Sequence, residues 1–300
     1  MWMLLAIALP MLAGEALAAW RPKDRTARQN FVVGSACLTA VCALAAVFTL
    51  RGEEPLVLLS MGEKLTIAFQ VDGLSCIFAA LVSVLWPLAS LYAVEYMSRE
   101  GSENRFFVFY LISFGVTLGI AFSANVLTMY LFYELLTLAT LPLVMHHMDG
   151  KARYAGRVYL TYSMCGAALG FIAMVLMIEH GAWFFQLGGS VTVTAGKENT
   201  LRLAYILGFF GFGVKAAVFP GHKWLLRASV APTPVTALLH AVAVVKAGVF
   251  AVARITWYGF GPDLLRGSWC QYLAMGAAVF TIVYASSKAL RTKHLKRRLA

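Results

Sequence analysis

Apolar residues are grouped along this chain into stretches of about 20, and short connections between them hold most of the charged residues. An α-helix needs about 20 apolar residues to cross the hydrocarbon core of a bilayer. A transmembrane barrel would instead show short segments of alternating polarity. We therefore predict an all-α polytopic membrane protein with about nine transmembrane helices. The expected helices cover residues 1–20, 31–50, 72–97, 106–123, 125–147, 155–179, 201–219, 233–257 and 268–290.

Two of the longer connections carry weak signs of other structure. The connection 51–69 is polar with an apolar middle, which suggests a short hairpin or an interfacial segment. The connection 181–201 contains the alternating run Val191–Thr194, a pattern that favours a strand.

The distribution of basic residues predicts the orientation of the chain in the membrane. If the N-terminus lies outside, the inside loops and the C-terminal tail hold roughly 17 lysines and arginines, against about six outside. The first apolar run, 1–20, ends in a sequence that resembles a signal-peptide cleavage site, but no basic residue precedes it. We expect it to be a membrane helix. The expected location is the inner (plasma) membrane, with the N-terminus outside and the C-terminus cytoplasmic.

Composition narrows the possible chemistry. The chain is 60% hydrophobic and 13% charged, about half the charged fraction of a soluble domain. Basic loops on one side of a membrane explain the net charge of +11, so we expect no nucleic-acid partner. The five cysteines show neither a CxxC motif nor metal-ligand spacing. We expect no metal, no cofactor and no redox site in this chain, and whether it forms part of an enzyme is left open.

Three charged residues lie inside apolar stretches, where charge is costly. They are Glu134, Lys215 and Lys246. A lysine at the middle of a membrane helix costs about 3 kcal/mol on insertion scales, and such a residue is usually functional. Lys215 lies five residues before Pro220-Gly221, so we expect a broken helix. Broken helices at membrane depth border ion paths in transporters.

His240 lies between that break and Lys246. On a regular helix, the two residues would point about 120° apart and lie roughly 9 Å apart along the axis. Histidine titrates near neutral pH, and burial readily changes the proton affinity of a lysine. Glu134, Lys215, His240 and Lys246 therefore form a series of acids and bases suited to passing protons.

Each of these residues also has a purely structural interpretation. Glu134 and Lys215 are compatible with a structural ion pair, and His240 with a hydrogen-bonded histidine of the core. Lys246 would reach the interface if its helix began one turn away from the expected position.

Several stretches resemble the antiporter-like proton-translocating subunits of respiratory complex I, membrane-bound hydrogenases and multisubunit cation/proton antiporters. They are Val71–Ser75, Asn125–Glu134, Lys215–Pro220, Pro232–His240 and Lys246–Phe250. The last three form a long and specific match, and the resemblance extends over nearly all 300 residues.

The resemblance implies a role for each candidate. Glu134 corresponds to the family's glutamate on the fifth helix, Lys215 to its lysine on the broken seventh helix, and Lys246 to its connecting lysine on the eighth. His240 matches a histidine common in the family. The implied mechanism is a relay in which the Glu134–Lys215 pair tightens or opens and the proton passes towards Lys246.

The resemblance also implies an organisation in three parts. Residues 1–105 would hold helices 1–3. Residues 106–257 would form one inverted-repeat unit of five helices, numbers 4–8, with the seventh broken. Residues 258–300 would add a ninth helix and a basic cytoplasmic tail. Family members usually have about fourteen helices, so we expect a fragment, a chain completed by a partner, or a short form that does not pump alone.

Three functions remain open at this stage. The first is a proton-translocating subunit of a redox-driven complex, resembling NADH:quinone oxidoreductase or a hydrogenase. The second is a subunit of a multisubunit Na⁺/H⁺ antiporter, and the third is a truncated, non-conducting assembly subunit. These three functions all imply other membrane subunits and the lipid bilayer as partners. The first two functions also imply protons as transported ions, and the second implies Na⁺ as well.

Overall fold

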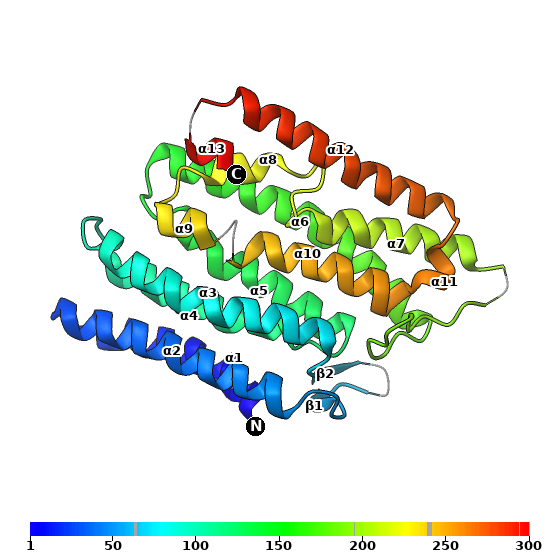
Figure 1. Ribbon diagram of the computed structural model, residues 1–300, viewed down its shortest axis with the longest axis horizontal. Helices are drawn as coiled ribbons and strands as arrows, with labels where there is room; N and C mark the ends of the chain where they lie inside the picture. The colour runs from blue at the N-terminus through cyan, green and yellow to red at the C-terminus, as the bar shows by residue number, and fades with distance from the viewer. Residues whose placement is uncertain (63–64, 195, 239–241, 294, 300) are drawn as a thin grey trace.

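The computed structural model describes residues 1–300 except 63–64, 195, 239–241, 294 and 300. It is a bundle of long helices that lie roughly side by side (Figure 1). Within the described residues, seven helices are long and apolar enough to cross a membrane. They are α1 (Trp2–Trp20), α2 (Arg25–Thr49), α3 (Gly73–Met97), α4 (Glu103–Ala121), α5 (Val126–Val144), α6 (Gly150–Glu179) and α12 (Trp269–Arg291). The chain is therefore an all-α polytopic membrane protein.

The two other expected helices are divided, so the count of nine is not confirmed. The stretch 201–219 forms α7 (Glu198–Gly213) and then an irregular turn. The stretch 233–257 contains α9 (Thr233–Ala237), α10 (Val244–Arg254) and the start of a π-helix, η2 (Ile255–Phe260). Three short helices complete the set: α8 (Lys223–Ala228), α11 (Pro262–Leu265) and α13 (Leu295–Leu299).

Some helices begin before the apolar run that predicted them, because an acidic residue caps their first turn. The carboxylate of Asp24 accepts hydrogen bonds from the backbone of Thr26 and Ala27, so α2 starts at Arg25. Asp149 accepts from the backbone N–H of Ala152 at 2.6 Å and caps α6 in the same way. An acidic N-cap satisfies amide groups that the first helical turn leaves unpaired.

The connection 51–69 contains the hairpin that its sequence suggested. Strand β1 (Leu56–Ser60) pairs antiparallel with β2 (Thr66–Phe69). The strand expected at Val191–Thr194 is not formed. This segment lies as irregular chain against the end of α6, where Thr192 donates its backbone N–H to the carbonyl of His180 at 2.8 Å.

The two ends of the bundle differ in character. One end, here called the hairpin end, carries β1, β2, α11 and the loop 180–197; the opposite end, here called the basic end, carries α9, α13 and the turn between α3 and α4 (Figure 1). At the hairpin end, backbone hydrogen bonds join the hairpin to residues 122–124, and join the loop to η2.

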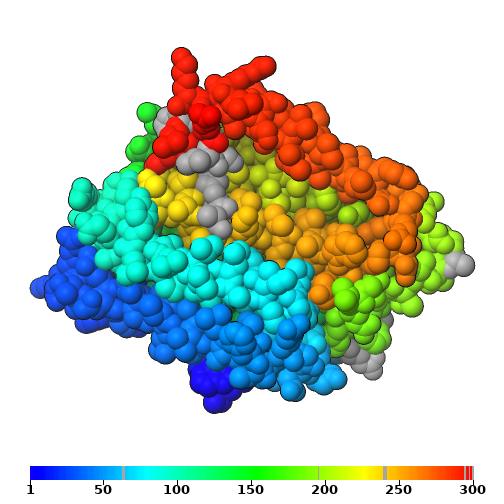
Figure 2. All heavy atoms as spheres, viewed as in Figure 1, coloured from blue at the N-terminus to red at the C-terminus, as the bar shows by residue number. Residues whose placement is uncertain are grey.

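The core is dense between α1 and α7, while α12 stands apart. Trp86 of α3 stacks on Phe114 of α4, with ring centroids 4.6 Å apart. Helices α6 and α7 approach closely, because a Cβ added at Gly166 would lie 2.7 Å from the carbonyl oxygen of Gly211. In contrast, α12 lies along the edge of the molecule with most of its apolar side chains exposed (Figure 2).

Candidate functional site

Lys215 lies in the turn that ends α7. The helix stops at Gly213, and the chain turns through Ala217, which has a positive φ of 57°, before α8 begins at Lys223. The indole N–H of Trp224 donates to the carbonyl of Val214 at 2.8 Å, so a side chain satisfies one of the carbonyls that the break frees. The helix expected over 201–219, with a break at Pro220-Gly221, thus already ends at Gly213, and Lys215 lies in the irregular turn rather than inside the helix.

The ammonium group of Lys215 is fully enclosed by protein. The residue is 1% exposed. Its Nζ donates to the backbone carbonyl of Tyr133 on α5 and lies 3.4 Å from the centroid of the Tyr133 ring. The Tyr133 hydroxyl donates to the carbonyl of Phe212 at 2.6 Å, which fixes the ring against α7. An aromatic face and one carbonyl thus hold the cation.

Glu134 follows Tyr133 directly but makes no close ion pair with Lys215. Among the described residues, no pair of nitrogen and oxygen atoms within 4.0 Å joins the two side chains. One oxygen of Glu134, Oε1, is buried and has no hydrogen-bond partner within the described protein.

A row of buried hydroxyl groups continues from Glu134 toward the basic end. Thr137 and Thr140 follow on the same helix, three and six residues later, and both are buried. The Thr140 hydroxyl lies 2.8 Å from the hydroxyl of Tyr159 on α6. The Thr137 hydroxyl, like Glu134 Oε1, has no partner in the described part of the chain. A buried hydroxyl or carboxylate oxygen without a protein partner can take a hydrogen bond from water.

Helix α10 lies directly against the break. A Cβ added at Gly248 would lie 2.7 Å from the carbonyl carbon of Lys215 and 2.9 Å from the Cα of Ala216. Only glycine permits an approach this close. The backbone of α10 therefore forms one wall of the Lys215 site.

The structure does not bring Lys246 into this buried site. Lys246 lies on α10, but its side chain is exposed. Helix α10 reaches the molecular surface between α3 and α12 (Figure 2). His240, the fourth candidate, lies outside the described residues. Glu134 and Lys215 are thus the two candidates that the structure places together.

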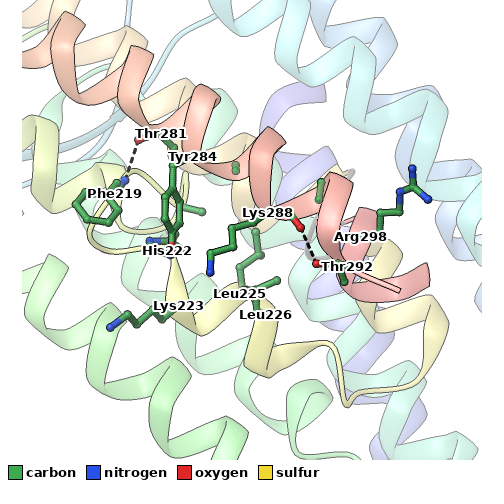
Figure 3. A pocket seen from close by; sticks show the side chains of 13 residues that line it. Phe219, His222, Lys223, Leu225, Leu226, Thr281, Tyr284, Lys288, Thr292 and Arg298 are labelled. Carbon is green, nitrogen blue, oxygen red and sulfur yellow. Dashed lines mark hydrogen bonds between the residues drawn. The ribbon is translucent and has the colours of Figure 1, made fainter. Parts of the chain in front are cut away.

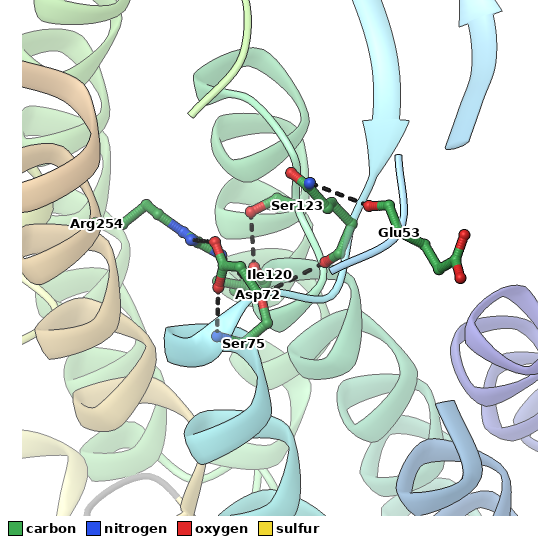
Figure 4. Close-up of polar contacts among 7 residues, drawn as sticks. Glu53, Asp72, Ser75, Ile120, Ser123 and Arg254 are labelled. Carbon is green, nitrogen blue, oxygen red and sulfur yellow. Dashed lines mark hydrogen bonds and ion pairs between the residues drawn. The ribbon is translucent and has the colours of Figure 1, made fainter. Parts of the chain in front are cut away.

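A second buried cation, Arg254, escaped the sequence-based prediction of functional residues. It is the last residue of α10 and is 1% exposed. Its guanidinium pairs with the carboxylate of Asp72, at the start of α3, and donates to the hydroxyl of Ser75 at 2.8 Å (Figure 4). The rings of Phe250 and Tyr258 lie 5.0 and 4.8 Å from its central carbon.

The sequence gives no direct signal for this pair, because 182 positions separate its members. Asp72 also accepts a hydrogen bond from the backbone N–H of Ser75 at 2.8 Å and so caps α3. Viewed along the sequence, Asp72 resembles an ordinary helix cap and Arg254 an ordinary interfacial residue. Only the packing of α10 against α3 shows that they meet.

The arrangement suits proton transfer. Among the described residues, no group of three or more His, Cys, Asp and Glu side chains is placed to hold a metal ion. A buried lysine beside a carboxylate can gain and release a proton, because a change in the distance between them changes the stability of the charged amine.

Two family models match separate parts of this chain, and both indicate the same family. The family model described as "NADH:quinone oxidoreductase/Mrp antiporter, TM" matches residues 123–300. The model described as "NADH-Ubiquinone oxidoreductase (complex I), chain 5 N-terminus" matches residues 59–107.

Curated relatives are longer proteins. The chain is 34% identical over 246 residues to a Na⁺/H⁺ antiporter subunit of Alkalihalophilus pseudofirmus, a match that covers 80% of this chain and 29% of the relative. It is 28% identical over 298 residues to a probable K⁺/H⁺ antiporter subunit of Rhizobium meliloti, covering 96% of this chain and 29% of the relative. The chain thus spans about three-tenths of the length of these relatives.

A solved structure shares the fold. A chain of the membrane-bound sulfane sulfur reductase, an archaeal respiratory membrane complex, superposes with a TM-score of 0.80 at 21% identity, over 99% of this chain and 61% of that one. The predicted resemblance is confirmed: the chain belongs to the NADH:quinone oxidoreductase/Mrp antiporter transmembrane family.

Proposed function

We propose that this chain is a proton-translocating subunit of a multisubunit membrane complex and that Lys215 is its central proton carrier. The observation that carries the proposal is the setting of Lys215. Its amine is fully buried at a break in a membrane helix and is held by a carbonyl and an aromatic ring rather than by a close carboxylate. An intramembrane lysine of this kind has a functional role by default.

In the proposed mechanism, the distance between Glu134 and Lys215 controls the proton affinity of the amine. When the carboxylate approaches, it stabilises the charged lysine and a proton is taken up. When it withdraws, burial favours the neutral amine and the proton leaves.

The buried hydroxyls of Thr137, Thr140 and Tyr159 support a route between Lys215 and the basic end. Hydroxyls donate and accept hydrogen bonds, so together with water they can conduct protons. Lys246 and His240 are proposed as the later steps. The exposed position of Lys246 supports transfer to a neighbouring protein surface rather than within this chain.

We further propose the finer organisation and orientation that the sequence suggested. Residues 106–257 would form one transport unit of five membrane helices: α4, α5, α6, the broken α7–α8 segment and the α9–α10 segment. The helices of 1–105 would precede this unit and the α12 segment of 258–300 would follow it. The excess of lysine and arginine in the loops of the basic end supports a cytoplasmic position for that end and for the C-terminus.

Two kinds of complex are candidates, and the relatives favour one. Relatives at 34% and 28% identity are named as subunits of Na⁺/H⁺ and K⁺/H⁺ antiporters, which supports a cation/proton antiporter. The complex I models and the respiratory complex that shares the fold support the redox-driven alternative. In the second case, the redox chemistry would belong to other subunits.

The experiment that tests this proposal measures proton transport by the assembled complex in sealed vesicles. Lys215→Ala and Glu134→Ala are expected to reduce proton transport strongly while the complex still assembles. Lys151→Ala, an exposed lysine at the basic end, is the matched control and should transport as wild type does.

Normal transport in both site variants would refute the relay and would favour the non-conducting assembly role. The two kinds of complex are separated by the driving reaction. Transport driven by an imposed Na⁺ or K⁺ gradient indicates the antiporter, and transport that requires an electron donor and acceptor indicates the redox complex.

A further inference from the structure

A cavity of about 270 Å³ lies on the edge of the molecule, between the break after α7, helix α8 and the C-terminal half of α12. It is well separated in sequence and position from the Asp72–Arg254 pair at the hairpin end. Liquid water occupies roughly 30 Å³ per molecule, so the cavity is much larger than a single ion or water needs. Its lining side chains come from the turn after α7, from α8, from α12 and from α13 (Figure 3).

The deep part of the cavity is apolar. Phe219 and Leu225 line one side, and Ala285 and Ala289 of α12 line the other. Phe219 packs edge-on against Phe280 with centroids 4.7 Å apart, and its backbone N–H donates to the hydroxyl of Thr281 at 3.0 Å. These contacts join α12 to the turn after α7.

The lining of the cavity is also cationic. Lys223 of α8, Lys288 of α12 and Arg298 of α13 belong to it, together with His222. In Figure 3, the head groups of Lys223 and Arg298 lie on opposite sides of Lys288. Lys288 extends across the cavity toward α8 (Figure 3), and its Nζ lies 5.7 Å from the centroid of the Tyr284 ring.

Among the described residues, no ion pair joins these cations to a carboxylate. Asp and Glu are absent from the described residues that line the cavity. From residue 199 to the end of the sequence the only acidic residue is Asp263, which precedes α12 at the opposite end of that helix. The described lining therefore carries an excess of positive charge.

His222 adds a polar ring to the lining of the cavity. Its ring lies against Phe219 and Tyr284, with centroids 5.4 and 5.3 Å away. Its Nδ1 atom is buried and has no hydrogen-bond partner within the described protein. A buried ring nitrogen without a partner offers a hydrogen bond to a ligand.

We propose that this cavity binds one anionic glycerophospholipid, with the phosphate at Lys288, flanked by Lys223 and Arg298, and one acyl chain along Phe219, Leu225 and Ala285. Basic pockets at the interfacial ends of membrane helices recognise such headgroups. The lining residues of α12 also extend far enough along the helix to contact an acyl chain. From Thr281 to Thr292, α12 rises about 16 Å, at 1.5 Å per residue.

The apolar wall is what identifies a lipid rather than a free phosphate ester. A soluble phosphate would use the cations and leave the deep part of the cavity without a function. A lipid uses both parts at once and covers a segment of α12 that is otherwise exposed. The lipid would then tether α12 to the broken α7, immediately beside the turn that holds Lys215.

The test extracts the protein, with the chains that accompany it, into micelles containing equal amounts of phosphatidylglycerol and phosphatidylcholine with the same acyl chains. Native mass spectrometry then counts the lipids that stay on the released protein. We expect one phosphatidylglycerol per copy of the chain, retained about tenfold more than phosphatidylcholine.

Two variants address the two parts of the site separately. Lys288→Gln with Arg298→Gln removes two cations, and Ala285→Phe fills the apolar wall while keeping every charge. Each is expected to lower phosphatidylglycerol retention about tenfold. Lys23→Gln with Arg25→Gln removes two exposed charges from the α1–α2 loop, and this matched control should retain the lipid. Since α12 is largely exposed, Ala285→Phe should not prevent folding.

Several results would overturn the proposal. Equal retention of both lipids, or unchanged retention in both variants, would show that no specific site exists. Displacement of the lipid by excess glycerol 3-phosphate would identify a soluble ligand. If Ala285→Cys in the assembled complex cross-links to a neighbouring protein segment and no lipid is retained, a helix occupies the cavity instead.

Discussion

Two buried cations in this protein are held in opposite ways. Arg254 lies against a carboxylate, a hydroxyl and aromatic rings, so a counter-ion balances its charge. Lys215 has a single carbonyl and a ring, and its carboxylate neighbour Glu134 stays beyond ion-pair distance. Arginine keeps its charge in proteins, whereas a buried lysine can lose its proton. The comparison separates a fixed structural cation from one that is able to change state.

The sharpest test of this comparison exchanges the two side chains. Lys215→Arg keeps the positive charge but removes the ability to release a proton, so we expect transport to fall to the level of vesicles without the complex. Arg254→Lys should retain measurable transport, because Asp72 still has a cationic partner. The measurement is the initial rate of proton uptake at equal amounts of assembled complex. Transport by Lys215→Arg at the wild-type rate would show that Lys215 is also a fixed charge.

The second prediction concerns stability. Asp72→Ala leaves the Arg254 guanidinium buried without its counter-ion, and removal of one member of a buried pair costs about 3–5 kcal/mol. We expect a large drop in the thermal midpoint of the purified protein. Glu134→Ala should lower the midpoint much less, since Glu134 makes no close ion pair. A double variant, Asp72→Ala with Arg254→Ala, should recover part of the loss. Equal midpoints for the two single variants would contradict the distinction between the two cations.

A third variant perturbs the contact between the helix that carries Arg254 and the turn that carries Lys215. Gly248→Ala places a Cβ 2.7 Å from the carbonyl carbon of Lys215, so α10 must move away from the break. Overpacking of this kind costs about 1–3 kcal/mol. We expect a moderate loss of thermal stability together with slower transport. Gly276→Ala is the control, because an added Cβ there meets nothing within 4 Å. Slower transport in the control as well would show that the effect is not specific to the contact.

The smallest expected effect comes from a third buried basic side chain, His146, at the basic end beyond α5. Burial is the main cause that lowers the pKa of His146 below its ordinary value near 6.5, and Arg105 and His147 add to this. The folded protein therefore binds this proton more weakly than the unfolded chain. The consequence is a loss of stability as the pH falls from about 6.5 through the lowered pKa.

Replacing His146 isolates that contribution. The thermal midpoint of wild type should fall slightly more between pH 7 and pH 5 than that of His146→Gln. The exposed neighbour His147→Gln serves as the control and should follow wild type. An identical pH dependence for His146→Gln and wild type would contradict the role assigned to burial.

The helices were largely predictable from the sequence, because their lengths follow from apolar runs that match a bilayer. The seven spanning helices lie within six residues of the expected ranges at each end, and the acidic caps Asp24 and Asp149 explain the largest differences. The burial of Lys215 and the break before Pro220 were also predictable, since a charge inside an apolar run and a Pro-Gly pair are local signals.

Features that depend on contacts between distant helices were not predictable. Nothing in the sequence around Lys246 shows which face of α10 meets the rest of the bundle, and its side chain proves to be exposed. The Asp72–Arg254 pair requires that α10 pack against the start of α3. The strand expected at Val191–Thr194 does not form for a similar reason. Within the described residues, no neighbouring strand pairs with this segment, and it packs against the end of α6 instead.

The contacts of α10 give this helix a mechanical role. Arg254 fixes its end to α3, and Gly248, six residues earlier, touches the backbone of the turn that holds Lys215. Six residues of helix span about 9 Å. Helix α10 therefore connects the hairpin end of the molecule to the turn that holds Lys215. If a neighbouring protein displaced α3, α10 would transmit the movement to the position of the Lys215 amine.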